Sequence, residues 1–352
     1  MSDRAAATAG FVFTGAALAA ALGDWSARTP RFVALGAAAV AILAFLSGRH
    51  GLLDRRRAAP LAAIGSVGIV AAGVAGVGGA SGVLLPGATA AAGVFACAFA
   101  WADWRGTSRD RLVDQAQSVV VGGLIGIVGL LASIVWLGLL AGAQGALPGS
   151  LPTVGTSVLS TVAGGLGFVT ATAGYVVWSG RDRSFIDIAM PDRREWGYVF
   201  LATVAILAVN VGTGVLVDWL GVESTDHVIF VEARSNPEIL LTFVPLSYLV
   251  VAPSEELLFR NVIQKSLRDQ FSRYGTVVVA TLIFAAVHFS AFNTEGSTLA
   301  FVSTLGIVFV SSLILGVAYE LTHNLTVSVL VHGTNNAVAF AVTYAELTGL
   351  IG

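Results

Sequence analysis

The chain has 352 residues, of which 56% are hydrophobic and only 11% are charged. A soluble globular domain carries about 25% charged residues, so this composition indicates a polytopic membrane protein. The formal net charge is -2, and no dense basic face argues for a nucleic-acid partner. Cys97 is the only cysteine, which excludes a disulfide or a cysteine-based metal site within one chain.

Apolar stretches long enough to cross a bilayer follow one another along the chain. A membrane-spanning helix needs about 20 apolar residues, and by this length we predict an all-α bundle of about 11 spans. They cover residues 5–23, 32–48, 60–77, 84–101, 118–142, 153–178, 198–217, 239–264, 274–289, 297–319 and 325–348. The third and fourth are weak and are separated only by residues 78–83, so 9 to 11 spans remain open. The first also has features of a cleaved signal peptide, with Arg4 before an apolar run.

The basic residues predict the orientation, because short cytoplasmic loops carry an excess of Lys and Arg. With the N-terminus inside, sixteen basic residues fall on the inner side. Only Arg28, Arg31 and Arg234 fall on the outer side. We therefore expect a multi-pass protein of the cell membrane, surrounded by lipid, with a cytoplasmic N-terminus and an external C-terminus.

The character of the spans changes at about residue 180. Residues 1–180 hold N-terminal spans with almost no polar residues beyond Ser and Thr, and glycine pairs such as Gly122 with Gly126 favour close helix packing. Residues 181–197, which we call the interfacial segment, mix charged and aromatic residues in a way typical of a membrane interface. In residues 198–352 polar side chains return to the spans, and they return in pairs.

Three pairs of residues spaced four apart each lie on one face of a helix. The pairs are Glu256 with Arg260, Phe284 with His288, and His332 with Asn336. Glu255 precedes the first pair and points about 100° away from Glu256 round the helix. Because ionisable groups near hydrocarbon are costly, such residues predict a functional site.

Depth along the helices indicates that the pairs meet. In a helical hairpin that turns between residues 269 and 274, Glu255 and His288 each lie fourteen residues from the turn. At 1.5 Å per residue both are about 21 Å deep. His332 lies only seven residues past Leu325, about 11 Å deep, so it requires a tilted helix or a deeply placed loop.

A carboxylate and two histidines that converge in a cleft of low dielectric are suited to acid and base chemistry on water. Burial disfavours the ionised carboxylate, which makes Glu255 a candidate general base. His288 beside it orients the water or transfers its proton. His332 with Asn336 donates hydrogen bonds to an oxyanion. This combination predicts peptide hydrolysis within the membrane.

The motifs Glu-Glu-x-x-x-Arg (255–260), Phe-x-x-x-His (284–288) and His-x-x-x-Asn (332–336) resemble, in this order, those of the CPBP intramembrane proteases. This family, also called Abi, includes the type II CAAX prenyl endopeptidases. The resemblance covers about residues 239–340 and includes Tyr-Glu-Leu-Thr at 319–322. It implies that residues 198–352 form a protease core.

The same resemblance implies a role for each site residue. It implies that Glu255 activates water with His288, that His332 and Asn336 form the oxyanion site, and that Glu256 with Arg260 supports them. The metal dependence of the family is unsettled, so we expect no particular cofactor. A divalent metal such as zinc stays an alternative, since Glu255, His288 and His332 are allowed ligand types. The implied substrate is a membrane-associated or lipidated protein.

Two other functions remain open. A proton-coupled secondary transporter would use intramembrane carboxylates and histidines as a relay, but its repeats would place polar residues in both halves. A non-catalytic scaffold would have lost Glu255 or His288, and both are present. We interpret the remaining histidines, His50, His227 and His323, as surface residues of loops.

Overall fold

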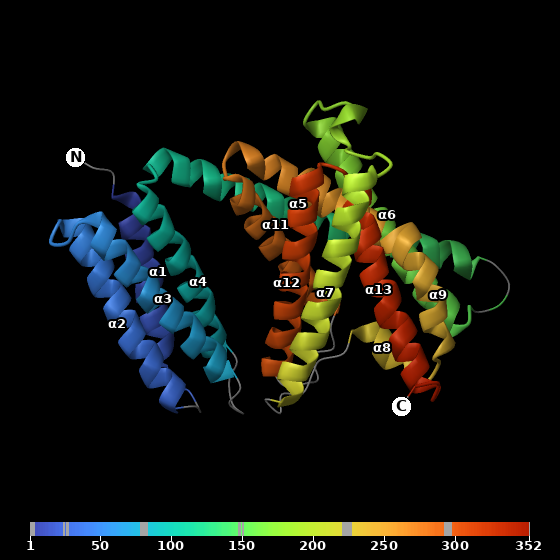
Figure 1. Ribbon diagram of the computed structural model, residues 1–352, viewed down its shortest axis with the longest axis horizontal. Helices are drawn as coiled ribbons and strands as arrows, with labels where there is room; N and C mark the ends of the chain where they lie inside the picture. The colour runs from blue at the N-terminus through green and yellow to red at the C-terminus, as the bar shows by residue number, and fades with distance from the viewer. Residues whose placement is uncertain are drawn as a thin grey trace. The chain divides into compact units, whose positions relative to one another are not determined.

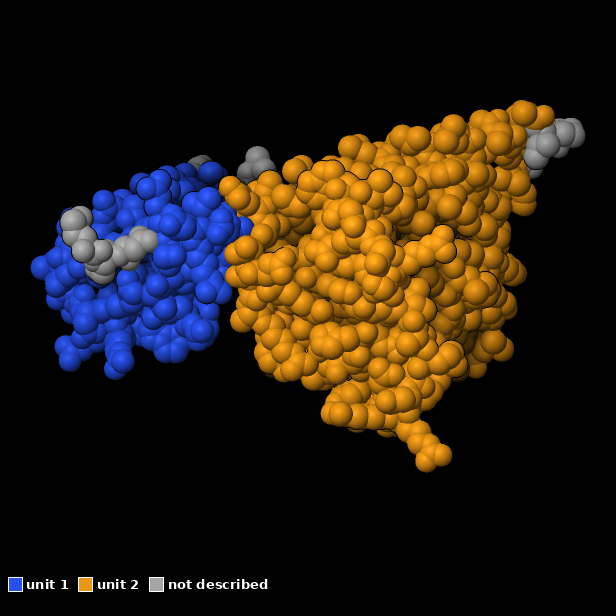
Figure 2. Space-filling model, turned by 90° about the horizontal axis from the view of Figure 1, so that it is seen from above, with its two compact units in different colours: residues 1–116, 297–302 blue, residues 117–296, 303–352 orange. Residues whose placement is uncertain are grey.

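The computed structural model describes residues 4–23, 25, 28–77, 84–146, 149, 151–219, 227–291 and 298–351. These described residues form helices and connecting turns, with no strand among them. The chain divides into two compact units, coloured blue and orange in Figure 2. Unit 1 comprises residues 1–116 with 297–302, and unit 2 comprises residues 117–296 with 303–352.

The all-α polytopic architecture predicted from the sequence is confirmed. Within the described part of the chain, ten helices are long and apolar enough to cross a membrane. The remaining predicted span, residues 274–289, is the helix α11 (Arg273–Val287). Its fifteen residues extend about 22 Å, less than a hydrocarbon core of about 30 Å. The connection at residues 78–83, on which the span count depended, lies outside the described residues.

Unit 1 contains the first four helices of Figure 1, which pack through small residues. They are α1 (Ala5–Leu22), α2 (Arg28–His50), α3 (Arg55–Val77) and α4 (Leu84–Arg105). A Cβ built on Gly73 of α3 would lie only 2.6 Å from the backbone nitrogen of Ala90 on α4. At the end of α4, the buried Asp103 pairs with Arg55 at 3.4 Å.

Unit 2 contains most of α5 and the remaining long helices. They are α5 (Arg109–Gly145), α6 (Thr153–Trp178), α7 (Arg193–Trp219), α12 (Thr298–Thr322) and α13 (Leu325–Leu347), with the shorter α8 (Val228–Ala233) and α9 (Glu238–Leu246). The predicted close packing at Gly122 and Gly126 is present, since these glycines of α5 face Ile283 and Val287 of α11. Helix α6 and most of α5 thus belong to the same compact unit as residues 198–296, although the boundary predicted from the sequence lay at residue 180. The roles assigned to residues 1–180, 181–197 and 198–352 stay predictions.

The span predicted at residues 239–264 is not one regular α-helix. Helix α9 continues into the π-helical η2 (Ser247–Val251), the α-helical α10 (Ala252–Glu256), the π-helical η3 (Leu257–Gln264) and the 3₁₀ turn η4 (Leu267–Asp269). Pro245 and Pro253 lack the N–H that a regular α-helix needs. Short π-helical turns are frequent at functional sites, and the two adjacent glutamates lie between two of them.

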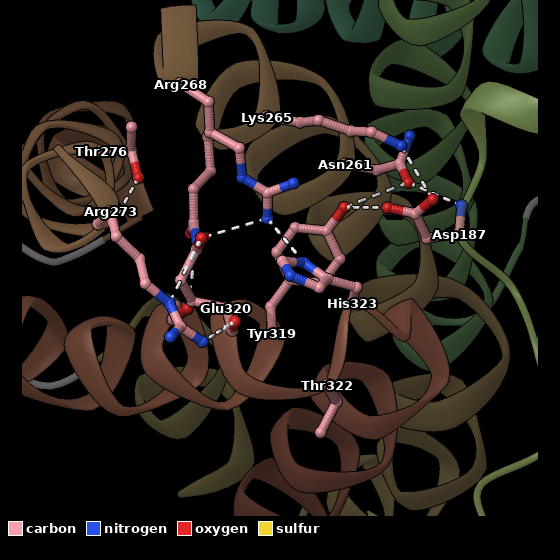
Figure 3. Close-up of polar contacts among 12 residues, drawn as sticks. Asp187, Asn261, Lys265, Arg268, Arg273, Thr276, Tyr319, Glu320, Thr322 and His323 are labelled. Atoms are coloured by element: carbon pink, nitrogen blue, oxygen red, sulfur yellow. Dashed lines mark hydrogen bonds and ion pairs between the residues drawn. The ribbon is translucent and has the colours of Figure 1, made fainter. Parts of the chain in front are cut away.

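The interfacial segment covers the turn between α12 and α13. In Figure 3, Asp187 of this segment accepts hydrogen bonds from Lys265 Nζ at 2.8 Å and from the Tyr319 hydroxyl at 2.6 Å. Its backbone carbonyl accepts from Leu325 N, the first residue of α13, at 2.7 Å. The turn at Asn324 is therefore buried rather than exposed at the inner surface. Helix α13 starts at this buried turn, and its His332 Nε2 lies 3.9 Å from Glu255 Oε2.

Candidate active site

The structure brings Glu255, His288 and His332 together. The Glu255 Oε2 atom lies 3.5 Å from His288 Nε2 and 3.9 Å from His332 Nε2. The three side chains come from α10, from the end of α11 at η5 (His288–Ala291) and from α13. Their side chains are between 9% and 18% exposed, so the group is largely shielded from solvent. The equal depth expected for the hairpin is thus found.

A hydrogen bond to the backbone fixes the tautomer of His288. Its Nδ1 lies 2.9 Å from the carbonyl oxygen of Phe284. A carbonyl can only accept, so Nδ1 carries the proton, and the Nε2 of a neutral ring presents a lone pair toward Glu255. The Phe284 ring, whose centroid is 4.1 Å from that of His288, packs beside the imidazole. The spacing of four residues therefore places both the ring and the hydrogen-bond acceptor that orient His288.

Glu256 occupies a different environment from Glu255. Its Oε2 accepts from Arg260 Nε at 3.0 Å, and both side chains are completely buried. Its Oε1 lies 2.9 Å from His332 Nδ1. Arg260 also donates from Nη2 to Ser312 Oγ at 2.9 Å. The expected ion pair is thus present, and it orients His332 so that Nε2 points toward Glu255.

Asn336 lies one helical turn beyond His332 on α13. Its Oδ1 accepts from Asn335 Nδ2 at 3.3 Å, and Asn335 Oδ1 in turn accepts from Asn210 Nδ2 at 2.8 Å. Among the described residues, Asn336 forms no hydrogen bond with Glu255 or His332. The helix places it on the same side as His332, and its predicted role as an oxyanion donor stays a prediction.

One carboxylate oxygen and two imidazole nitrogens converge in this site. Glu255 Oε2 is buried and has no hydrogen-bond partner among the described residues. The Nε2 atoms of His288 and His332 lie 3.5 Å and 3.9 Å from it. Because buried polar atoms normally have partners, the site is complementary to a species that donates protons or carries positive charge. A water molecule or substrate N–H fits the first description.

A metal cation would fit the second description by ligand chemistry, since carboxylate oxygen and imidazole nitrogen are both zinc ligands. Among the residues that the structure describes, no group of three potential ligands is arranged to hold a metal ion. The ligand types therefore match, while the arrangement of the side chains does not form a metal cage. The metal alternative stays a prediction.

The sequence analysis missed His227. We interpreted it as a surface residue of a loop, but it is partly buried at the start of α8 and lies close enough to His288 and Glu255 for their charges to act on it. Burial, with repulsion from His288, lowers the pKa of His227 to about 4. Its local sequence gives no signal of this position, because the proximity of His227 to Glu255 and His288 depends on tertiary packing.

The other two histidines lie away from these groups. His50 is exposed at the end of α2. His323 lies at the turn after α12, where its Nδ1 is 3.0 Å from Arg268 Nη2. Figure 3 shows this contact beside Glu320, which pairs with Arg268 and Arg273. Tyr319 and Glu320 of the Tyr-Glu-Leu-Thr stretch therefore connect α12 with Asp187, Arg268 and Arg273.

Helices α5 and α6 pack against the elements that carry Glu255 and His288. Phe168 of α6 packs edge-on against Phe259 of η3, with ring centroids 5.7 Å apart. Phe259 in turn packs edge-on against Phe284, at 4.9 Å. A Cβ on Gly129 of α5 would lie 2.7 Å from the Phe168 ring, so this glycine lets α5 approach. Two of the N-terminal spans, α5 and α6, therefore pack against the elements that carry the candidate site.

A comparison with protein families agrees with the motifs. The family described as type II CAAX prenyl endopeptidase Rce1-like matches residues 237–338. This stretch contains all three motifs, so the resemblance to the CPBP and CAAX proteases is confirmed. At the level of the family, the match supports a CAAX-type intramembrane protease in a multi-pass membrane protein. Comparisons with curated proteins and with solved structures gave no match.

Proposed function

We propose that this protein is an intramembrane endopeptidase that hydrolyses peptide bonds of a membrane-associated protein with water activated by Glu255. The main support is the position of the Glu255 carboxylate, 3.5 Å from His288 Nε2 and 3.9 Å from His332 Nε2. All three residues fall in the segment that matches the protease family. A carboxylate placed between two imidazoles at membrane depth is suited to remove a proton from water.

The proposed reaction begins with a water molecule held by Glu255 and His288. Glu255 takes one proton as the water oxygen attacks the carbonyl carbon of the peptide. The carbonyl oxygen becomes an oxyanion. When the C–N bond breaks, Glu255 returns the proton to the leaving nitrogen, and the products are a carboxylic acid and an amine. The carboxylate thus acts first as a base and then as an acid.

His332 suits the oxyanion role because of its bond to Glu256. With Nδ1 donating to Glu256 at 2.9 Å, the ring needs a second proton on Nε2 to donate toward the substrate. The Glu256 carboxylate stabilises that cationic ring, and Arg260 keeps the carboxylate ionised. Asn336, one turn further, would add its amide as a second donor. Removing one oxyanion donor costs about 10² to 10³ in kcat in other enzymes.

An apolar groove lies between α6 and the segment that carries Glu255, although Glu255, His288 and His332 do not line it. The groove has a volume of about 400 Å³. Its lining comes from α6, from η2 to η3, from α13 and from Ile188 of the interfacial segment, and it includes Ser254, next to Glu255. Such a lining favours an apolar peptide segment or a lipid group attached to the substrate. Which of the two binds there is part of the proposal to be tested.

The proposal is tested with purified protein in detergent and a library of apolar peptides, with cleavage mapped by mass spectrometry. We expect hydrolysis by the wild type and a decrease of about 10² to 10⁴ in kcat for Glu255→Gln, which keeps the shape but removes the base. Thermal unfolding of the variant should match the wild type. Full turnover by Glu255→Gln would contradict the role of Glu255 in activating water.

The metal alternative is tested in the same assay. Dialysis against a chelator followed by metal analysis shows whether activity depends on a bound cation. Loss of turnover that zinc restores would assign Glu255, His288 and His332 as ligands. Unchanged turnover in a metal-free sample would support the glutamate mechanism.

A further inference from the structure

A row of polar side chains continues from Glu256 toward the inner side of the core. We call this row the polar seam, and its residues are spaced four apart on two facing elements. The segment from α10 to η4 contributes Glu256, Arg260, Gln264 and Arg268, and α12 contributes Ser312, Gly316 and Glu320. Gln264 Nε2 donates to Gly316 O at 3.1 Å and to Glu320 Oε2 at 3.0 Å. The inner end of the seam, at Arg268 and Glu320, is visible in Figure 3.

Two polar atoms in the middle of the polar seam lack hydrogen-bond partners. They are Arg260 Nη1 and Gln264 Oε1, and both side chains are completely buried. Neither atom bonds to any other part of the chain that the structure describes. Nη1 is a donor and Oε1 is an acceptor. Because unpartnered buried polar atoms are rare in folded proteins, this matched pair indicates a ligand that both accepts and donates.

Gly316 brings the two atoms to one place. A Cβ built on Gly316 would lie 3.0 Å from Gln264 Oε1 and 3.6 Å from Arg260 Nη1. The two atoms are therefore at most about 6.6 Å apart, yet they do not bond directly. One water molecule with two hydrogen bonds of about 2.9 Å spans up to about 5.8 Å, which covers most of this range. A buried water needs two to four polar partners, and this site offers at least two.

We propose that a single ordered water molecule binds between Arg260 Nη1 and Gln264 Oε1 beside Gly316 and positions His332 through Arg260 and Glu256. The positioning role rests on the proposed function, whereas the binding site does not. Arg260 would then be held at all three nitrogens, by Glu256, by Ser312 and by the water. A fixed Arg260 fixes the Glu256 carboxylate, and this carboxylate orients His332. Gln264 and Gly316 are thus positioning residues outside the three motifs.

The functional test fills the space beside Gly316. In Gly316→Ala, the new methyl group occupies the position near the two orphaned atoms, so water is displaced. We expect kcat to fall about 10- to 100-fold, the range found for outer-shell residues that orient the ligands of metal sites, with KM unchanged. Gly306→Ala on the same helix is the matched control, because a Cβ there meets no atom within 4 Å. It should retain wild-type kcat.

A second variant separates the loss of water from tight packing. The new methyl of Gly316→Ala would lie 2.7 Å from Val277 Cγ1. The double variant Val277→Ala with Gly316→Ala relieves that contact but still fills the water position. If kcat stays low in the double variant, the water site accounts for the effect. Recovery of kcat would mean that packing alone was responsible and would overturn the positioning role.

A direct observation tests the binding site independently of catalysis. An experimental structure of the wild type, fine enough to resolve ordered water, should show density between Arg260 Nη1 and Gln264 Oε1. A direct hydrogen bond between these atoms, or no density there, would overturn the proposal whatever the activity. If the density is present but no peptide is cleaved, the proposed function fails and the water site stands.

Discussion

At the scale of single residues, two adjacent glutamates have different partners although they differ by one position in the chain. Glu255 faces the Nε2 atoms of two imidazoles, whereas Glu256 accepts from Arg260 at 3.0 Å and from His332 Nδ1 at 2.9 Å. The rotation of about 100° between neighbours on a helix causes this separation. Glu255 is therefore available to an incoming molecule, while Glu256 is fully occupied by the protein.

This difference predicts that Glu256→Gln destabilises the fold. The substitution leaves Arg260 buried without its counter-ion, and breaking a buried ion pair costs about 3 to 5 kcal/mol. We expect the free energy of unfolding to fall by about 3 to 5 kcal/mol. Turnover should fall as well, because His332 loses the carboxylate that orients it. Thermal unfolding in detergent measures the effect, and Glu346→Gln at the exposed end of α13 is the control. Wild-type stability of Glu256→Gln would contradict the importance of the ion pair.

His227 predicts a pH dependence of stability. Its pKa is about 4 in the folded protein, because burial and repulsion by His288 outweigh the attraction of Glu255, and the usual value is 6.5. The unfolded chain therefore binds more protons between these values, so stability present above about pH 6.5 is lost as pH falls toward 4. We expect the Tm of His227→Asn to decrease less than that of the wild type over this interval.

His50→Asn is the control for this experiment, because His50 is exposed in unit 1 and should leave the wild-type pH dependence unchanged. Asn is a suitable replacement at position 227, where the side chain caps α8 by accepting from Ile229 N at 3.2 Å, and Asn is a favoured capping residue. Equal pH dependence in His227→Asn and the wild type would show that His227 is not buried in the folded protein.

At the scale of elements, close approach of helices lets α5 and α6 pack against the elements of the candidate site. Helix α6 carries Gly167 where it meets α5, and a Cβ there would overlap the backbone of Ser133. Small residues allow such approach between membrane helices, where packing rather than the hydrophobic effect drives association. The position of Phe168, next to this glycine and packed on Phe259, links the contact to the site.

Gly167→Ala is therefore expected to reduce stability. Overpacking a close contact typically costs about 1 to 3 kcal/mol, and the backbone of Ser133 has to move to accept the methyl group. Gly174→Ala on the same helix is the matched control, because a Cβ there meets no atom within 4 Å. Thermal unfolding in detergent compares the two variants. Equal Tm values would mean that α5 and α6 do not pack as closely as the structure indicates.

At the scale of the whole molecule, the orientation in the membrane stays a prediction. The structure modifies its basis, because Arg260 is completely buried in the polar seam and does not count as a loop residue. Fifteen basic residues then remain on the predicted inner side against three on the outer side. This asymmetry still favours a cytoplasmic N-terminus.

Reporters fused at each end of the chain test this topology. We expect an N-terminal reporter to be cytoplasmic and one fused after Gly352 to be external. Ten crossings would place both ends on one side, so an external C-terminus requires the short α11 and its continuation to complete a crossing. A cytoplasmic C-terminal reporter would mean that α11 and its continuation do not cross the membrane.

The amino-acid sequence was sufficient to predict a polytopic membrane protein, most of its spans and the proximity of Glu255 to His288. Those features depend on local properties: composition, length of apolar stretches and spacing of four residues along a helix. The equal depth of Glu255 and His288 was predictable for the same reason, because both helices leave one short turn and rise by a constant 1.5 Å per residue.

The packing of the helices places His227 near the site, buries the turn at Asn324 beneath the interfacial segment, and groups α5 and α6 with the core. The π-helical turns around the two glutamates were also not predictable from the apolar pattern. Each of these features depends on contacts between residues far apart in the chain, such as Leu325 N with Asp187 O at 2.7 Å. Apolar helices offer many alternative packing partners, and their sequences alone do not select among them.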